Sequence, residues 1–255
     1  GARVDALVGH TREGRRIMNT TYRSLDAHSH GLGVHRASLC HVLDQHLHTL
    51  PHQRLMDCTV SAVETLADHA TVIAEQAGEP CRLSFDAVLI ANGSHSRLRP
   101  AAWTRYDRLY PWGAMWAMQP MVESFAAPLL QQRYHQAGQM AGILPTGCRP
   151  DQPEQALASF FWSLPVAQMN DWQHPDFDFA GWRQQALTLW PQLESVLAPL
   201  THQKQLLPAT YRDVIMHHWG ENRLGIIGDA AHAMSPQLGL SLIHISEPKR
   251  RTPIS

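Results

Sequence analysis

The segment RLGIIGDAAHAMSPQLG, residues 223–239, decides how the fold of this chain is interpreted. Residues 223–227 are largely apolar, which is typical of a short buried strand. Gly228 and Asp229 follow where such a strand would end. Ligands of open α/β sheets bind beyond the carboxyl ends of the strands. We therefore expect the Asp229 carboxylate to accept hydrogen bonds from a hydroxyl-rich ligand at a tight glycine turn.

The residues that follow extend this prediction. Residues 235–239 would offer backbone N–H groups near the start of a helix, where a negative charge is favoured. A Gly-Asp pair after a strand is common, so the pair alone would be explained as an ordinary turn. The complete segment is far more specific than the pair.

A second segment, DAVLIANGSHSRLR, occupies residues 86–99. We expect one strand over residues 83–91, and its continuously apolar end predicts burial on both faces. Asn92 and Gly93 then predict a turn.

A third segment begins at Arg36, where apolar residues recur at helical spacing until Pro51 ends the predicted helix. Arg36 lies near the start of this helix and could bind a phosphate through its guanidinium fork, or could be an ordinary surface arginine. The preceding Gly31 and Gly33 suggest a GxGxxG motif, but Arg36 takes the place of its last glycine. The dinucleotide-binding motif is therefore not satisfied.

These three segments, in this order, closely resemble motifs of the class A FAD-dependent aromatic monooxygenases, the para-hydroxybenzoate hydroxylase-like family. The resemblance implies that Asp229 binds the ribityl chain of FAD and that Gly228 also belongs to the cofactor site. It also implies that Pro236 lies against the isoalloxazine ring, and that the amides of Leu238 and Gly239 face its pyrimidine edge.

The same resemblance assigns cofactor contacts to the two upstream segments. Arg36 would contact the pyrophosphate and ribityl region of FAD. Asn92 and Gly93 would form the turn near the pyrophosphate that influences the use of NAD(P)H in the family. Asn92 stands where the family has Asp, so one negative charge is lost and the handling of the pyridine nucleotide is left open.

The resemblance implies an α/β fold in which a mixed β-sheet substrate domain is inserted into a Rossmann-like FAD-binding domain. The FAD-binding domain would be partial, because the family begins with a GxGxxG unit and this chain is expected to start after it. We assign residues 24–100 and 221–240 to this domain, and residues 1–23 and 101–220 to the substrate domain.

Three strands of one sheet are expected in the substrate domain, at residues 113–118, 139–144 and 158–164. Asp178 predicts the start of a helix whose apolar face continues to Leu197. An antiparallel strand pair is expected at residues 4–8 and 15–23.

Residues 241–255 are excluded from the predicted fold. They resemble the translated read-through of a sequencing adapter, and their prolines oppose the helix with which the family continues. We expect a non-native tail; a genuine terminus or a basic localisation patch is the alternative.

Composition places limits on the remaining function classes. The chain has 255 residues, 44% of them hydrophobic, and a formal net charge of -1, so it is expected to be globular with no general attraction to nucleic acid or an anionic membrane. No apolar run is long enough for a membrane span and no export signal is visible, so we expect a cytoplasmic protein.

Cysteine and histidine content adds little to the functional interpretation. The four cysteines form no CxxC pair, which favours free thiols. Of the 17 histidines, four are close in sequence: His41, His46, His48 and His52. A metal site there is an alternative, but surface and capping histidines are favoured because no other ligand type accompanies them at ligand spacing.

The implied reaction is hydroxylation of a small aromatic substrate with FAD, NAD(P)H as co-substrate and O₂. No catalytic residue or metal ligand is assigned, and the oligomeric state is left open. One alternative is that this chain is an inactive fragment that cannot hold FAD. Another is a flavin-dependent reductase or dehydrogenase on the same scaffold, and a histidine-rich metal-binding protein is more remote.

Overall fold

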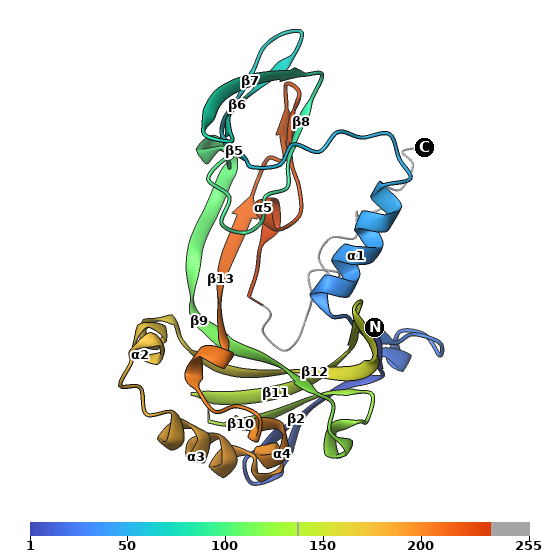
Figure 1. Cartoon of the computed structure of the whole chain (residues 1–255), viewed down its shortest axis with the longest axis vertical. Coiled ribbons are helices and arrows are strands. Elements are labelled where there is room, and N and C mark those ends of the chain that lie inside the picture. The colour runs from blue at the N-terminus through green and yellow to red at the C-terminus, as the bar shows by residue number, and fades with distance from the viewer. Residues whose placement is uncertain (137, 236–255) are drawn as a thin grey trace, which may run out of the picture. The chain divides into compact units, whose positions relative to one another are not determined.

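The computed structural model describes residues 1–136 and 138–235 (Figure 1). The chain forms two compact units. The first contains Gly1–His52 and Pro111–Thr210. The second contains Gln53–Tyr110 and the described residues from Tyr211 onward. The division of the chain into a cofactor domain and a substrate domain stays a prediction.

A seven-stranded mixed sheet dominates the fold, with the strand order β13-β9-β12-β11-β10-β2-β3. β10 and β2 are parallel, whereas the pairs β2–β3, β10–β11, β11–β12 and β12–β9 are antiparallel. The three strands predicted in the substrate domain are confirmed within β9, β11 and β12, which are longer than expected. The strands are β2 (Ala6–Thr11), β3 (Arg16–Thr21), β9 (Thr104–Pro120), β10 (Leu129–His135), β11 (Gln139–Arg149), β12 (Gln152–Pro165) and β13 (Leu207–Met216).

The β2–β3 hairpin confirms the predicted antiparallel pair at the start of the chain. Gly14 closes its turn with φ +89°, a conformation that glycine adopts without steric cost. The expected strand at residues 4–8 is wrong in its bounds, because the chain changes partner at Asp5. Before that residue β1 (Ala2–Val4) pairs with β4 (Gly31–Gly33), and after it β2 joins the large sheet.

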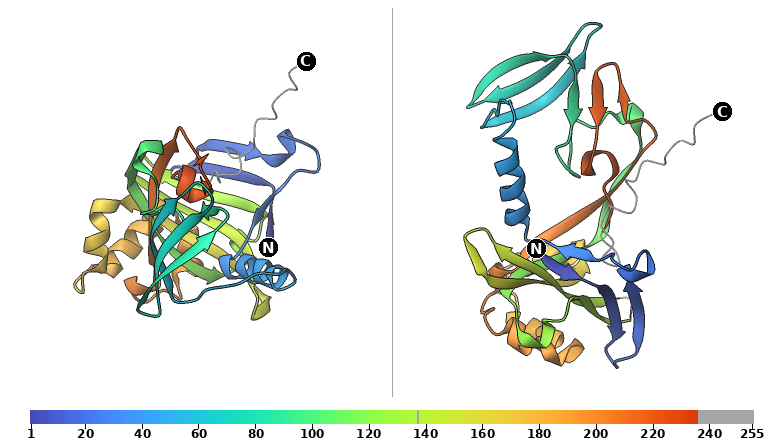
Figure 2. Two further views of the ribbon diagram at one scale, coloured as in Figure 1. Left: turned by 90° about the horizontal axis from the view of Figure 1, so that it is seen from above. Right: turned by 90° about the vertical axis from the view of Figure 1, so that its right-hand side faces the viewer.

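Helices α2 (Met169–Gln173), α3 (Phe179–Leu189) and α4 (Glu194–Leu197) pack on the seven-stranded sheet, as the orange helices of Figure 2 show. Asp178 caps α3 as predicted, since its Oδ1 accepts from the Gly181 amide at 2.8 Å. The expected single helix to Leu197 is wrong, because Trp190 leaves the helical conformation before Pro191. Short 3₁₀ helices occupy Tyr22–Ser24, Ala101–Trp103, Glu123–Phe125, Val166–Gln168, Pro191–Leu193 and Gln203–Gln205.

The core of the first unit lies between this sheet and these helices. Phe160 and Trp162 of β12 are buried there against Trp182 of α3, with ring centroids 6.3 and 6.1 Å away. Trp162 is therefore a packing residue of the core. Burial of several large aromatic rings is the main source of stability that this arrangement offers.

Helix α1 (Arg36–Leu47) begins at the predicted residue and ends before Pro51. Its apolar residues do not form a buried face: Leu39, Val42 and Leu43 are 49%, 60% and 59% exposed. No residue of α1 is buried, so helical spacing predicted the helix but not its burial.

The second unit contains two small sheets. β5 (Cys58–Thr65), β6 (Ala70–Gln76) and β7 (Glu79–Phe85) form an antiparallel sheet. β14 (Gly220–Glu221), β15 (Leu224–Ile226) and β8 (Val88–Ile90) form the other, which leads into the short helix α5 (Asp229–His232).

The single strand predicted over residues 83–91 is wrong. The chain leaves β7 at Phe85 and enters the second sheet at Val88, where the Val88 amide donates to the Arg223 carbonyl at 2.8 Å. Burial on both faces was also wrong, because Ile90 is 3% exposed but Leu89 is 65% exposed. Among the described residues, no helix is long and apolar enough to cross a membrane.

Candidate functional site

The parallel pairing of β8 and β15 brings two of the predicted motifs together. Ile90 is the register partner of Ile226, and the Ile227 amide donates to the Ile90 carbonyl at 2.9 Å. Because parallel strands end at the same edge of a sheet, the turn after β8 and the turn after β15 lie at one edge. The sequence separates these turns by more than a hundred residues, and the sheet places them side by side.

Two glycines shape this edge. Gly93 has φ +87° and Gly228 has φ +60°, in the region that disfavours other residues. A Cβ atom added at either glycine would meet no atom within 4 Å. The backbone is therefore open to the close approach of a ligand at both turns.

Asp229 is the first residue of α5, directly after the Gly228 turn. Its side chain is exposed, and no described residue donates a hydrogen bond to its carboxylate. Asn92 is also exposed at the end of the neighbouring strand. An exposed carboxylate beside open glycine backbone is chemically suited to a ligand with hydroxyl groups.

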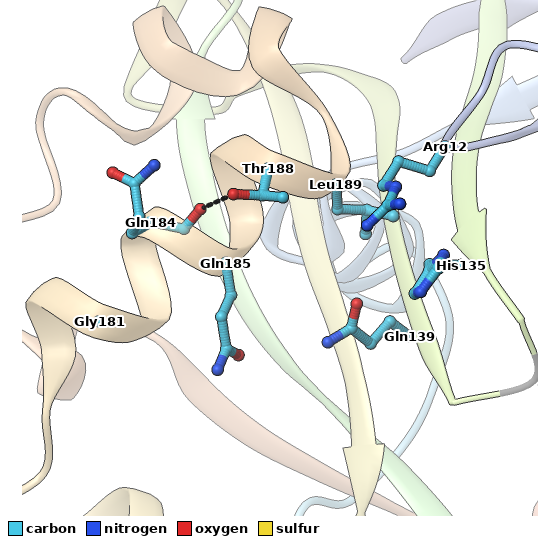
Figure 3. Close-up of a pocket in the computed structure, with 8 residues that line it drawn as sticks. All are labelled: Arg12, His135, Gln139, Gly181, Gln184, Gln185, Thr188 and Leu189. Atoms are coloured by element: carbon cyan, nitrogen blue, oxygen red, sulfur yellow. Dashed lines mark hydrogen bonds between the residues drawn. The ribbon is translucent and has the colours of Figure 1, made fainter.

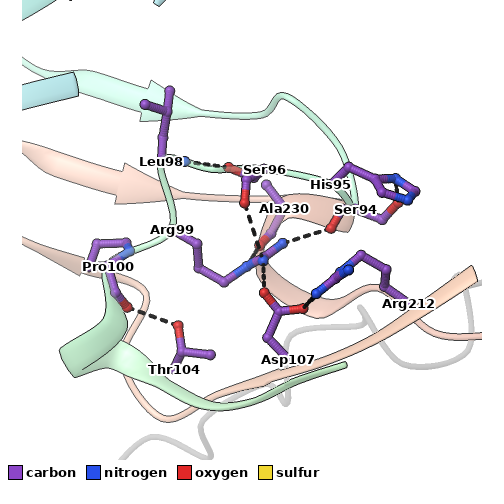
Figure 4. A network of polar contacts seen from close by, with 10 residues as sticks. All are labelled: Ser94, His95, Ser96, Leu98, Arg99, Pro100, Thr104, Asp107, Arg212 and Ala230. Carbon is purple, nitrogen blue, oxygen red and sulfur yellow. Dashed lines mark hydrogen bonds and ion pairs between the residues drawn. The ribbon is translucent and has the colours of Figure 1, made fainter. Parts of the chain in front are cut away.

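Arg99 holds the two turns in place, and sequence reasoning did not single it out. Its side chain is 3% exposed. The guanidinium donates to the Ala230 carbonyl in α5 at 2.6 Å and to the Ser94 carbonyl in the other turn at 3.0 Å (Figure 4). Arg99 lies within the second sequence segment, residues 86–99, but its partner in α5, the Ala230 carbonyl, could not be inferred from spacing.

Asp107 completes this network between two arginines (Figure 4). One of its carboxylate oxygens pairs with Arg99, and the other accepts from Arg212 Nη2 at 2.6 Å. The Asp107 side chain is 26% exposed. A partly buried carboxylate shared by two guanidinium groups fixes the orientation of Arg99.

Arg36 belongs to the first unit, where its position is fixed through contacts with β11. The His35 amide donates to the Thr146 carbonyl at 2.8 Å, and the Ser38 hydroxyl donates to the Cys148 carbonyl at 2.6 Å. Gly33 passes so close to β11 that an added Cβ would meet the Pro145 carbonyl oxygen at 1.8 Å. The Arg36 side chain is exposed, and its contact with a cofactor stays a prediction.

The remaining predicted site residues, Pro236, Leu238 and Gly239, lie outside the described residues. The segment that leads to them is attached to β13: the Val214 amide donates to the Ala233 carbonyl at 2.8 Å, and the Ser235 amide to Asp213 Oδ1 at 3.3 Å. In residues 1–136 and 138–235, no three His, Cys, Asp or Glu side chains are grouped so that they could hold a metal ion.

No family model matches the sequence, and no curated protein matches it either. Solved structures do match. PqsL, a probable FAD-dependent monooxygenase from Pseudomonas aeruginosa, matches with a TM-score of 0.72 and 16% identity over 92% of this chain and 62% of that chain. The chain has the fold of flavin-dependent monooxygenases.

Two further structures share this fold. The 2-methyl-3-hydroxypyridine-5-carboxylic acid oxygenase matches with a TM-score of 0.66 and 18% identity, over 92% of this chain and 60% of that chain. The flavin-dependent halogenase CmlS matches with a TM-score of 0.69 and 14% identity, over 92% of this chain and 42% of that chain. This chain therefore spans at most about three fifths of the length of these proteins.

Proposed function

We propose that this chain contributes part of the FAD site of a flavin-dependent monooxygenase that hydroxylates a small aromatic substrate with NAD(P)H and O₂. The observation that carries the proposal is the meeting of the turns after β8 and β15 at one sheet edge. The fold shared with flavin-dependent monooxygenases supports the same interpretation.

The described residues fit the polar parts of FAD. Asp229 would accept hydrogen bonds from ribityl hydroxyls through its exposed carboxylate. Gly93 and Gly228 would let backbone N–H groups approach the cofactor, and the Asn92 amide could donate to a pyrophosphate oxygen. Arg36 would supply positive charge for the pyrophosphate, and Pro236, Leu238 and Gly239 would contact the flavin ring.

FAD, when bound, supplies the redox chemistry that couples NAD(P)H oxidation to O₂ activation. The residues of this chain would bind and orient the cofactor. The proposed aromatic substrate rests on the fold and on the name of one structural neighbour, an oxygenase of a hydroxypyridine carboxylic acid.

The first experiment is a titration of the ¹⁵N-labelled full chain with FAD, followed by amide chemical shifts. We expect saturable shifts at Gly93, Gly228 and Asp229, even if affinity is only millimolar. Asp229→Ala should weaken binding by about 1.5–3 kcal/mol, the range for a hydrogen bond to a charged group. Glu221→Gln is the matched control, because it removes one exposed carboxylate from the same small sheet.

Shifts confined to other parts of the chain, or equal FAD affinity for the Asp229→Ala and Glu221→Gln variants, would remove this sheet edge from the cofactor site. The reaction type needs a separate measurement. Incorporation of labelled O₂ into an aromatic product supports a monooxygenase, whereas NAD(P)H oxidation without incorporation supports the reductase alternative.

A further inference from the structure

A pocket of about 400 Å³ lies in the first unit, between helix α3 and the end of the β10–β11 hairpin (Figure 3). None of its lining residues belongs to the motifs assigned to FAD. Its volume is within the range of small-molecule sites. Such sites combine an apolar lining with a few polar groups, and this pocket adds guanidinium, imidazole and amide groups to its apolar surface.

Both walls of the pocket are fixed by secondary structure. His135 and Gln139 are opposite one another in the β10–β11 ladder, so their side chains share one face of the sheet. Gln185 and Leu189 are four residues apart on α3 and therefore share one helix face. Leu189 is 1% exposed and provides an apolar floor.

Arg12 brings a guanidinium to the sheet side of the pocket, together with His135 (Figure 3). The position of its turn is fixed, because the Arg12 amide donates to the Tyr134 carbonyl at 2.7 Å. Glu13 approaches the Arg12 Nε at 3.5 Å, but its side chain is 64% exposed. An exposed pair of this kind is weak and leaves Arg12 available to a ligand.

This end of the sheet carries further positive charge. Arg133 lies two residues before His135 on the same strand face, and its buried Nε has no acceptor among the described residues. Burial lowers the pKa of His10, and the nearby Arg133 and Arg16 lower it further. The basic groups here exceed their carboxylate partners, which favours an anion.

We propose that this pocket binds a small organic carboxylate. Arg12 would hold the carboxylate through its two-pronged donor geometry, and His135 would add a further N–H donor. The amides of Gln139 and Gln185 would hydrogen-bond to other polar groups of the same ligand.

The test is a titration of the full chain with succinate, followed by amide shifts, beside an identical titration with the neutral isostere succinamide. We expect succinate to give saturable shifts around Arg12, His135 and α3, and succinamide to bind at least about tenfold more weakly. Arg12→Gln should lower succinate affinity at least about tenfold. Glu13→Gln should raise the affinity, because it removes the competing carboxylate.

Arg15→Gln is the matched control, since it removes one guanidinium from the same hairpin without touching the pocket. Its succinate affinity should equal that of the unmodified chain. Equal affinity for succinate and succinamide, unchanged affinity in Arg12→Gln, or no saturable shift up to about 50 mM succinate would each overturn the proposal. These outcomes are independent of FAD binding, because the two sites share no residue.

Discussion

Arg99 joins two segments that the sequence holds far apart, because its Nε donates to the Ala230 carbonyl at 2.6 Å. The same guanidinium donates to the Ser94 carbonyl and pairs with Asp107. One buried cation thus connects the turn after β8 with the helix that follows Gly228. The geometry of the sheet edge that we propose binds FAD, where the turns after β8 and β15 meet, depends on this connection.

Arg99→Met should therefore lower the free energy of unfolding by about 2–4 kcal/mol, because buried carbonyls and the Asp107 carboxylate would lose a charged donor. Urea denaturation measures this change. Arg97→Met is the control, since Arg97 is exposed in the same segment and should change stability by less than about 0.5 kcal/mol. Similar stabilities of the two variants would contradict the structural role of Arg99.

Gly33→Ala should detach the start of α1 from β11. The new Cβ would meet the Pro145 carbonyl oxygen at 1.8 Å, so the backbone must move. Overpacking of this kind costs about 1–3 kcal/mol. We expect faster amide hydrogen exchange in α1, together with a lower urea midpoint. Gly138→Ala, where an added Cβ meets nothing within 4 Å, should leave both measurements unchanged.

Asp178→Ala should destabilise α3, because the Gly181 amide loses its acceptor. The expected loss is about 1 kcal/mol in the free energy of unfolding. Asp176→Ala removes an equivalent carboxylate just outside the helix, where the side chain is 90% exposed. The cap assignment fails if chemical denaturation shows the same small effect for both variants.

His10 should make stability depend on pH. Burial, Arg133 and Arg16 lower its pKa in the folded chain below the ordinary value of 6.5. Between the lowered value and 6.5 the unfolded chain binds more protons, so the contribution of His10 to stability is present above this window and is lost as the pH falls through it.

Urea midpoints at pH 7.5 and 5.5 test this contribution. The loss of stability on acidification should be smaller in His10→Gln than in the unmodified chain. His41→Gln serves as the matched control for removal of an imidazole. An unchanged pH dependence in His10→Gln would show that burial and the nearby arginines do not lower the pKa of His10.

Local rules predicted several elements of this fold from the sequence. Gly14 marked the β2–β3 hairpin, Asp178 marked the start of α3, and the spacing after Arg36 marked the start of α1. Each depends on residues close together in the chain, so turn and capping preferences are sufficient. The same rules failed where long-range pairing determines the strands. They predicted one strand over residues 83–91, but β7 and β8 pair with different partners in separate sheets.

The candidate site likewise combines features set by neighbouring residues with features set by long-range pairing. The sequence by itself determined the Gly228-Asp229 turn, because a strand, a glycine and a carboxylate in succession specify that local geometry. Only the tertiary structure decided that the turn after β8 lies beside this turn, because the parallel register of Ile90 with Ile226 depends on pairing across the chain. It also decided that Arg99 is the cation that contacts both turns, because its partners come from distant parts of the sequence. Such pairing is selected by burial and charge in the folded unit, which sequence spacing does not encode.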